Sequence, residues 1–469
     1  MILRTIIFVL LQSSVTTAFA AEPGIPAPAR PGVVKPATGD TPKSDDRYVL
    51  YRSDDTKTRL WFSGLLQLRY SKLNDDSALP EGATVDTFSL QRARFTLGGT
   101  LDRLVEFKIE LNAWDSVNHE LSPEEVYGDL NLSEHFKLRA GLFKPPVMLH
   151  RMMSSANQLF AEEAMVTSQK VTQLKGFDAR KKLKTFPGKD TGIMVFGDLL
   201  PLPLGGLAGT LPAGFLRYYA AFQNGYDMKK GSGRGDAEML TLRLEANLFG
   251  FKPYRELSRD WARPHLTIGF NYGLGYDLEI QDEGERKRAR LLGLDFLGVW
   301  QGCSISGGWF VTTSEHTPAY ERSRLDDGAS FDPSWRSDGF FVQAAAFLPL
   351  RLRGVDLRRR LQFKLRFEEF DPFDTIGSSL YSEDMLTEFA PVGLNAPQDR
   401  RTRLTTLGLN WFQDVGGWKD RLMISLDYTI RTELEPFRDL NDPGPDGLGR
   451  LKNTQLRNNS LIFQLQLAM

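Results

Sequence analysis

The chain has 469 residues, a single cysteine and a formal net charge of −1, with 58 basic residues against 59 acidic ones. One cysteine cannot form an intrachain disulfide, which excludes a disulfide-stabilised scaffold. From Leu60 to Met469 no run approaches the roughly 18 consecutive apolar residues that a membrane helix requires, which excludes a helical membrane protein.

The first 20 residues predict a cleaved secretory signal peptide. Arg4 precedes a short apolar run, and Ala18 and Ala20 form a cleavage site of the A-x-A kind. Residues 21–52 are rich in Pro, Ala and Gly without periodicity, which predicts an extended periplasmic linker. The remaining domain, residues 53–469, is therefore expected to lie outside the cytoplasm.

This domain is dominated by segments about ten residues long in which apolar and polar side chains alternate, a pattern typical of strands. The alternation places Phe363 and Ile424 on the apolar face and Ser425 on the polar face. It therefore predicts that Ile424→Arg is costly in a bilayer and that Ser425→Arg costs little. The predicted strands lie near residues 59–71, 87–98, 104–114, 125–131, 135–144, 190–199, 214–223, 238–248, 263–277, 288–300, 303–313, 338–348, 360–370, 402–413, 420–431 and 457–469.

The connections between these strands tend to alternate between tight turns and long polar loops. Alternation of this kind is typical of an outer-membrane barrel and not of a Greek-key sandwich. Two connections on the short side, 200–213 and 249–262, are longer than this rule prefers. The sequence thus predicts an all-β, transmembrane, antiparallel up-and-down barrel of about 16 strands. The long connections are 72–86, 145–189, 314–337, 371–401 and 432–456.

The longest connection, residues 145–189, carries a dense group of basic residues. Ser155 and Gln158 fit a capping box, which predicts a short helix directly after them. From the residues alone, the connection is either a solvated outer loop or a segment folded into a cavity.

Several stretches resemble the phosphate- and polyphosphate-selective porins of Gram-negative outer membranes. They are FSLQRARFTLGGTL at 88–101, VEFKIELNAW at 105–114, LRAGLFKPP at 138–146 and PGKDTGIMVFGDL at 187–199. The resemblance implies a sixteen-stranded barrel that assembles as a homotrimer, with a third outer loop, here 145–189, folded into the pore. It also implies basic residues that guide anions, and phosphate or polyphosphate as solute. Where the family commonly has two adjacent arginines in the second strand, this chain has Gln91 and Arg92, with Arg94 retained.

The resemblance and the polar phase of the strands together predict a porin for passive diffusion of small hydrophilic solutes, with a preference for anions. A narrow passage focuses the field of its cations and raises the local anion concentration. The predicted pore-lining and anion-guiding residues are Arg92, Arg94, Lys137, Arg139, Lys175, Arg180, Lys181, Lys182 and Lys184.

Two other functions stay open on the sequence: a barrel with an adhesive or structural role, and an outer-membrane barrel enzyme. The five histidines show no metal-ligand spacing, and Glu124 and Glu125 are expected on opposite strand faces, so we predict no catalytic site, metal or cofactor. The expected partners are outer-membrane lipid, lipopolysaccharide and small anionic solutes, with no nucleic acid.

Overall fold

The computed structural model divides the chain into two units, Met1–Asp45 and Asp46–Met469, and every described residue belongs to the second. The described ranges are 48–75, 83–113, 121–168, 189–199, 212–225, 238–257, 264–279, 286–315, 334–348, 351–352, 355–357, 359–371, 402–415, 418–433, 437–439, 450–452 and 459–468.

Long strands make up most of these ranges. They are β2 (Arg59–Asp75), β3 (Ala83–Leu101), β4 (Val105–Asn112), β5 (Ser122–Asn131), β6 (Lys137–Phe143), β7 (Asp190–Asp198), β8 (Leu216–Gln223), β9 (Glu238–Asn247), β10 (His265–Glu279), β11 (Arg286–Trp300), β12 (Cys303–Glu315), β13 (Ser334–Phe347), β16 (Leu361–Asp371), β17 (Thr402–Val415), β18 (Trp418–Glu433) and β21 (Ser460–Ala468).

The other elements are short. They are the strands β1 (Tyr48–Arg52), β14 (Arg351–Leu352), β15 (Val355–Asp356), β19 (Phe437–Asp439) and β20 (Arg450–Lys452), the helices α2 (Leu149–Met152) and α3 (Met165–Ser168), and the 3-10 turn η1 (Ser155–Asn157). Within the described ranges, no helix has the length and apolar character needed to cross a bilayer.

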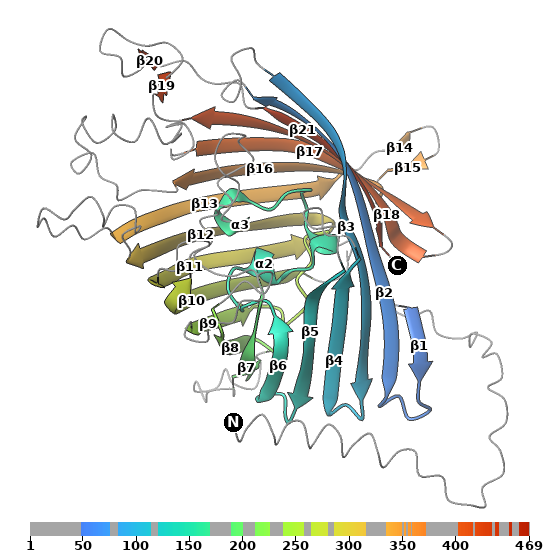
Figure 1. Cartoon of the computed structure of the whole chain (residues 1–469). Coiled ribbons are helices and arrows are strands. Elements are labelled where there is room, and N and C mark those ends of the chain that lie inside the picture. Colours follow the sequence, from blue (N-terminus) through green and yellow to red (C-terminus); the bar gives the residue numbers. More distant parts are fainter. Residues whose placement is uncertain are drawn as a thin grey trace, which may run out of the picture. The chain divides into compact units, whose positions relative to one another are not determined.

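The long strands pair antiparallel with their neighbours in chain order, and the pairing closes on itself (Figure 1). The last strand, β21, pairs with β18 on one side and with β2 on the other, from Leu65 opposite Ala468 to Leu73 opposite Ser460. The sheet has 17 strands, of which β1 pairs only with β2, so sixteen strands form the ring. The predicted all-β, antiparallel up-and-down barrel and the positions of all sixteen predicted strands are confirmed.

The small strand β1 extends the sheet towards the N-terminus. Its residues pair with Arg59–Phe62, at the end of β2 that β21 does not reach. The sequence prediction placed Tyr48–Arg52 at the end of the linker. Because Tyr48, Val49 and Tyr51 have strong strand propensity and β2 offers unpaired backbone groups there, the segment pairs instead.

The two faces of the ring differ as the alternation predicted. Phe363 is 43% exposed on the apolar outer face, whereas Ser425 on the polar inner face is 1% exposed. The prediction that Ser425→Arg costs little is nevertheless wrong. The Ser425 hydroxyl accepts a 2.7 Å hydrogen bond from the buried Lys364 ammonium, so an arginine there would be overpacked and would face a like charge.

The outer face gives a direct test of membrane orientation. Ile424 lies near the middle of β18 on the outer face, and we expect Ile424→Arg to lower the free energy of unfolding in lipid vesicles by about 2–4 kcal/mol. Leu132 lies in the tight turn after β5 and is 58% exposed, so Leu132→Arg should change it by less than about 0.5 kcal/mol. Urea titration of vesicle-inserted protein measures both. Equal losses would contradict the assignment of the outer face to lipid.

Candidate functional site

Four of the predicted pore-lining cations lie in described strands, and all four point to the inner face. Arg92 and Arg94 come from β3, and Lys137 and Arg139 from β6. The inner assignment follows from their partners: Arg92 donates a 2.7 Å hydrogen bond to Gln67, which is 1% exposed, and Arg94 contacts Ser155 of the long connection. The other five predicted residues, Lys175, Arg180, Lys181, Lys182 and Lys184, lie outside the described residues.

Arg92 and Arg94 belong to a group of interacting charges that we call the basic cluster. Arg94 lies 3.5 Å from Glu110 and 3.3 Å from Glu124, and Lys108 contacts both Glu110 and Glu125. Within the part of the chain that the structure describes, six cations face four carboxylates in this group, which gives these ten side chains a positive surplus. Its members are Arg92, Arg94, Lys108, Lys144, Arg151, Lys189, Glu110, Glu124, Glu125 and Glu163.

The surplus is concentrated around Glu163, which follows the 3-10 turn. Burial alone raises the pKa of the Glu163 carboxyl, but the charges of Arg92, Arg151 and Lys144 outweigh it and bring the pKa below its ordinary value. Among the described carboxylates, none lies within 4.0 Å of the Arg92 guanidinium. Sequence reasoning missed Lys144 and Arg151, because their approach to Arg92 depends on the path of the long connection.

Glu124 and Glu125 correct one sequence prediction. A β-bulge in β5 pairs Glu110 with Glu125 and Leu111 with Pro123, which leaves Glu124 without a cross-strand partner. Both carboxylates therefore face the basic cluster, and the expectation that they point to opposite faces is wrong. A bulge adds one residue to one strand and breaks the alternation on which that expectation rested.

Arg139 and Lys137 both come from β6 but differ from each other. Arg139 forms a two-pronged ion pair with Asp129, at 2.7 and 2.8 Å, and lies 3.7 Å above the ring of Tyr127. Its charge is largely neutralised. Lys137 has no carboxylate within 4.0 Å among the residues that the structure describes, and its side chain is partly exposed.

Residues 145–168 of the long connection lie against the inner face of the sheet, with α3 beside β12, β13 and β16 (Figure 1). The predicted capping box is wrong: Ser154, not Ser155, caps the 3-10 turn, and the Gln158 side chain bonds to the His150 carbonyl and to Glu163. The residues between η1 and α3 are irregular. Buried backbone of this kind must find partners outside itself.

Carboxylates of the inner wall supply the acceptors for its N–H groups. The Leu149 N–H donates to Asp295 at 2.9 Å, and the Ala161 N–H donates to Asp427 at 2.9 Å. The Met165 N–H donates to Glu368 at 2.6 Å. A carboxylate that accepts backbone N–H bonds is held in place and partly neutralised.

Cations and amides of the wall supply donors for its carbonyl groups. Lys364 donates to the Leu159 carbonyl at 3.0 Å, Arg69 to the Ala161 carbonyl at 2.5 Å and Arg366 to the Glu162 carbonyl at 2.8 Å. Apolar packing adds to these bonds. Val147, Met148, Met165 and Val166 form one buried cluster with inward-facing residues that include Phe310 and Phe341.

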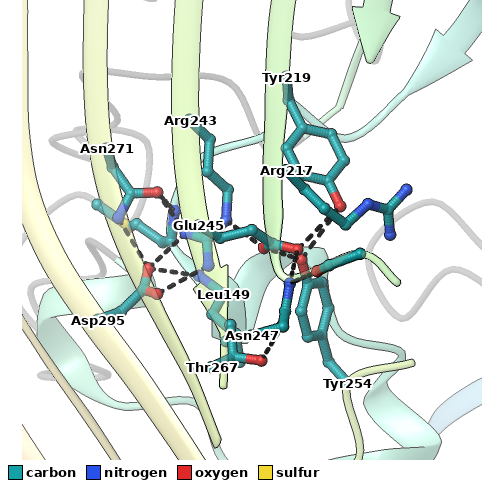
Figure 2. A network of polar contacts seen from close by, with 12 residues as sticks. Leu149, Arg217, Tyr219, Arg243, Glu245, Asn247, Tyr254, Thr267, Asn271 and Asp295 are labelled. Atoms are coloured by element: carbon teal, nitrogen blue, oxygen red, sulfur yellow. Dashed lines mark hydrogen bonds and ion pairs between the residues drawn. The ribbon is translucent and has the colours of Figure 1, made fainter. Parts of the chain in front are cut away.

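A second segment, residues 251–257, meets the first (Figure 2). Its Tyr254 hydroxyl donates to Glu245, which pairs with Arg243 at 3.1 Å. Arg243 also holds Asp295 at 2.8 and 2.9 Å, and Asp295 is the acceptor for the Leu149 N–H. One polar network therefore joins the two connections to β9 and β11.

Glu256 forms the closest contact between these two segments. Its carboxylate accepts hydrogen bonds from the Leu159 N–H at 2.8 Å and the Ser306 hydroxyl at 2.5 Å, and lies 2.5 Å from His150 Nε2. Burial alone raises its pKa, but the charge of His150 and these hydrogen bonds bring the pKa below its ordinary value. Glu256 is thus held as a carboxylate inside the ring.

In the described ranges, no group of three or more His, Cys, Asp or Glu side chains could hold a metal ion. What the arrangement does chemically is to present fixed, partly solvated cations along one part of the inner wall. Such a wall attracts anions without reacting with them.

Comparisons with known proteins identify a similar family and similar solved structures. A family model described as phosphate-selective porin O and P matches residues 65–196, which confirms the resemblance over that range. An anion-selective porin from Comamonas acidovorans has a similar structure, with a TM-score of 0.50, 11% identity, and coverage of 88% of this chain and 100% of that chain. The outer membrane channel DcaP of Acinetobacter baumannii gives a TM-score of 0.45 at 11% identity, covering 89% and 99%. No curated protein matches the sequence.

At these identities the structural likeness shows the fold alone. The sequence match adds the family to which residues 65–196 are similar, and that family consists of outer-membrane channels rather than enzymes.

The network around Asp295 predicts that a single substitution there lowers the free energy of unfolding strongly. Asp295→Asn leaves Arg243, which is 2% exposed, without a full counter-charge, and should lower the free energy of unfolding by about 3–5 kcal/mol. Asp102→Asn is the matched control, because the side chains of Asp102 and its partner Lys57 are 79% and 49% exposed; its cost should be under about 1 kcal/mol. Denaturant titration of refolded protein compares the two, and similar costs would contradict the network's importance.

The lowered pKa of Glu256 predicts a stability change in acid. A carboxyl with a lower pKa in the folded state stabilises the fold fully above its unfolded pKa of about 4.3, and this contribution disappears as the pH falls through the folded-state value. The difference in unfolding free energy between the wild type and Glu256→Gln should therefore be constant near neutral pH and shrink below about pH 4. A difference that does not change with pH would contradict this account.

Proposed function

We propose that this chain, whose residues 65–196 match the phosphate-selective porins O and P, is an outer-membrane porin that lets small hydrophilic solutes diffuse passively and prefers anions. The observation that carries the proposal is the positive surplus of the basic cluster on the inner wall. Inorganic phosphate and polyphosphate are the proposed solutes within this class.

The surplus matters because most other inner charges have a structural partner. Asp295, Glu368 and Asp427 accept hydrogen bonds from backbone N–H groups, and Arg243 is paired with carboxylates. Arg92 has no such pair among the described residues. A guanidinium in this position can bind a phosphate oxygen pair, whereas a lysine acts as a mobile point charge.

The proposal includes the long connection. We propose that residues 145–189 narrow the passage inside the barrel, which would place Lys175, Arg180, Lys181, Lys182 and Lys184 near the solute path. The contacts of residues 145–168 with the inner wall support this placement. We also propose a homotrimer, as the family resemblance implies; the mass of the detergent-solubilised protein by light scattering tests it.

Selectivity in planar bilayers tests the function. A cation about 8 Å from a solute in water contributes about 0.5 kcal/mol, which is about two-fold in local anion concentration. Replacing Arg92 and Lys137 together by Gln should therefore lower the anion-to-cation permeability ratio, measured from reversal potentials in a KCl gradient, by about four-fold.

Two further variants complete the experiment. Arg403→Gln removes a cation paired with Glu369, away from the basic cluster, and should leave the ratio unchanged. Replacing the five loop cations by Gln tests the long connection separately. An inserted wild-type protein that does not conduct, or wall and loop variants that keep wild-type selectivity, would contradict the proposal.

A further inference from the structure

We infer that the solute path is eccentric. It runs along the wall formed by β3, β4, β5 and β6, because two chain segments from opposite rims meet and fill the remainder of the ring. The residues 147–166 and 251–257 are together called the plug. The solute path rests on the proposed function, because it presupposes a channel. The structure of the plug can be tested without measuring an ion current.

The two segments enter from opposite rims. Antiparallel strands alternate in direction, so successive connections alternate between the two rims. The connection from β6 to β7, which contains residues 147–166, lies at one rim. The connection from β9 to β10, which contains residues 251–257, comes three connections later and therefore lies at the other. This accounts for the unexpected length of the latter on the side of the tight turns.

The two segments are joined by both polar and apolar contacts. Glu256 accepts from the Leu159 N–H, and its own N–H donates to the Asn157 carbonyl at 3.2 Å. Tyr254 packs against the buried cluster of Leu149 and Met153. Leu257 packs against two buried clusters, one with Leu159 and Phe160 and one with Phe347, Phe412 and Met423. The plug is therefore one packed unit and not two independent loops.

The burial of the inner wall shows where the plug lies. Inner-face polar residues from β9 to β18 are almost fully buried, with Thr241, Asn271, Lys364 and Asn410 at 0% exposure and Thr406 at 1%. The inner-face cations of β3, β4 and β6 are more accessible, with side-chain exposures of 14% for Arg94, 21% for Lys108 and 19% for Arg139, although Thr96 and Asn112 beside them are 6% exposed. The Glu162 side chain of the plug is 36% exposed and forms an ion pair with Arg69 of β2 at 2.6 Å.

Two consequences follow for the channel. Solutes pass the basic cluster because the plug covers the other strands. The ion selectivity of the channel is therefore set by β3, β4, β5 and β6 alone. Glu256 is a positioning residue: it touches no solute, but it fixes the segment that confines the path. Removing its charge should loosen the plug and expose wall residues that are otherwise covered.

Thiol labelling tests the inference. In a Cys303→Ser background, single cysteines are placed on the proposed path (Arg92→Cys, Lys137→Cys) and under the plug (Thr241→Cys, Thr406→Cys). The probe is a negatively charged, membrane-impermeant methanethiosulfonate, applied to protein folded in vesicles, and the readout is the intact mass over time. The path positions should react at least about ten-fold faster than the covered positions, because access limits thiol reactivity.

Glu256→Gln is then combined with the two covered reporters. We expect it to raise their labelling rate by about ten-fold or more, while Glu369→Gln, which removes a carboxylate outside the plug, leaves the rate unchanged. If Glu256→Gln does not fold, as judged by heat-modifiable migration on a gel, Tyr254→Phe tests the placement of the same segment by removing its hydrogen bond to Glu245 of β9.

Each labelling result either supports or overturns one part of the inference. Equal labelling of path and covered positions in the otherwise unchanged protein would overturn the eccentric path. Covered positions that stay protected in both Glu256→Gln and Tyr254→Phe would overturn the role of the joint. The expected labelling pattern in a protein that carries no current would support the plug and contradict only the proposed diffusion function.

Discussion

The structure depends on one constraint: irregular backbone enclosed by a barrel must find hydrogen-bond partners on the barrel wall. Residues 147–166 contain only short helical turns, so most of their N–H and C=O groups cannot be satisfied internally. Asp295, Asp427 and Glu368 accept from the N–H groups, and Lys364 and Arg366 donate to the carbonyls. Most of the charge inside the ring therefore has a structural role.

This constraint separates two kinds of inner charge. Under the plug, Arg243, Asp295, Lys364 and Asp427 are nearly fully buried and paired with each other, since an unpaired charge there would be strongly destabilising. Along β3–β6 the charges are partly solvated and the cations are in excess within the basic cluster. Fixed charges with partial access to water act on mobile ions, so the second kind is the one that bears on selectivity.

The alternation of side chains and the unequal connections sufficed to predict the barrel, its sixteen strands and the inner position of Arg92, Arg94, Lys137 and Arg139. Each of these features depends on local period-two geometry. What sequence reasoning could not supply depends on tertiary contacts or on broken periodicity. The bulge at Glu124 reverses a face, and the cost of Ser425→Arg depends on Lys364, which is 61 residues away in the chain.

The plug also could not be predicted from the sequence. The length of residues 249–262 was the one available signal, and it counted against the barrel because an inward path is not the default for a turn. Sequence reasoning also could not place Lys144 and Arg151 in the basic cluster, because their positions depend on the path of the long connection. The family resemblance implied a folded-in loop but not the segment that meets it from the opposite rim.

The central claim, that wall side chains hold the irregular backbone of the plug, is tested most directly by hydrogen exchange of the folded protein in lipid vesicles. The amides of Leu149, Leu159 and Ala161 should exchange as slowly as those of β10 and β11, because their N–H groups are bonded to buried carboxylates. Exchange at the rate of an open loop, with the strands still protected, would contradict the account.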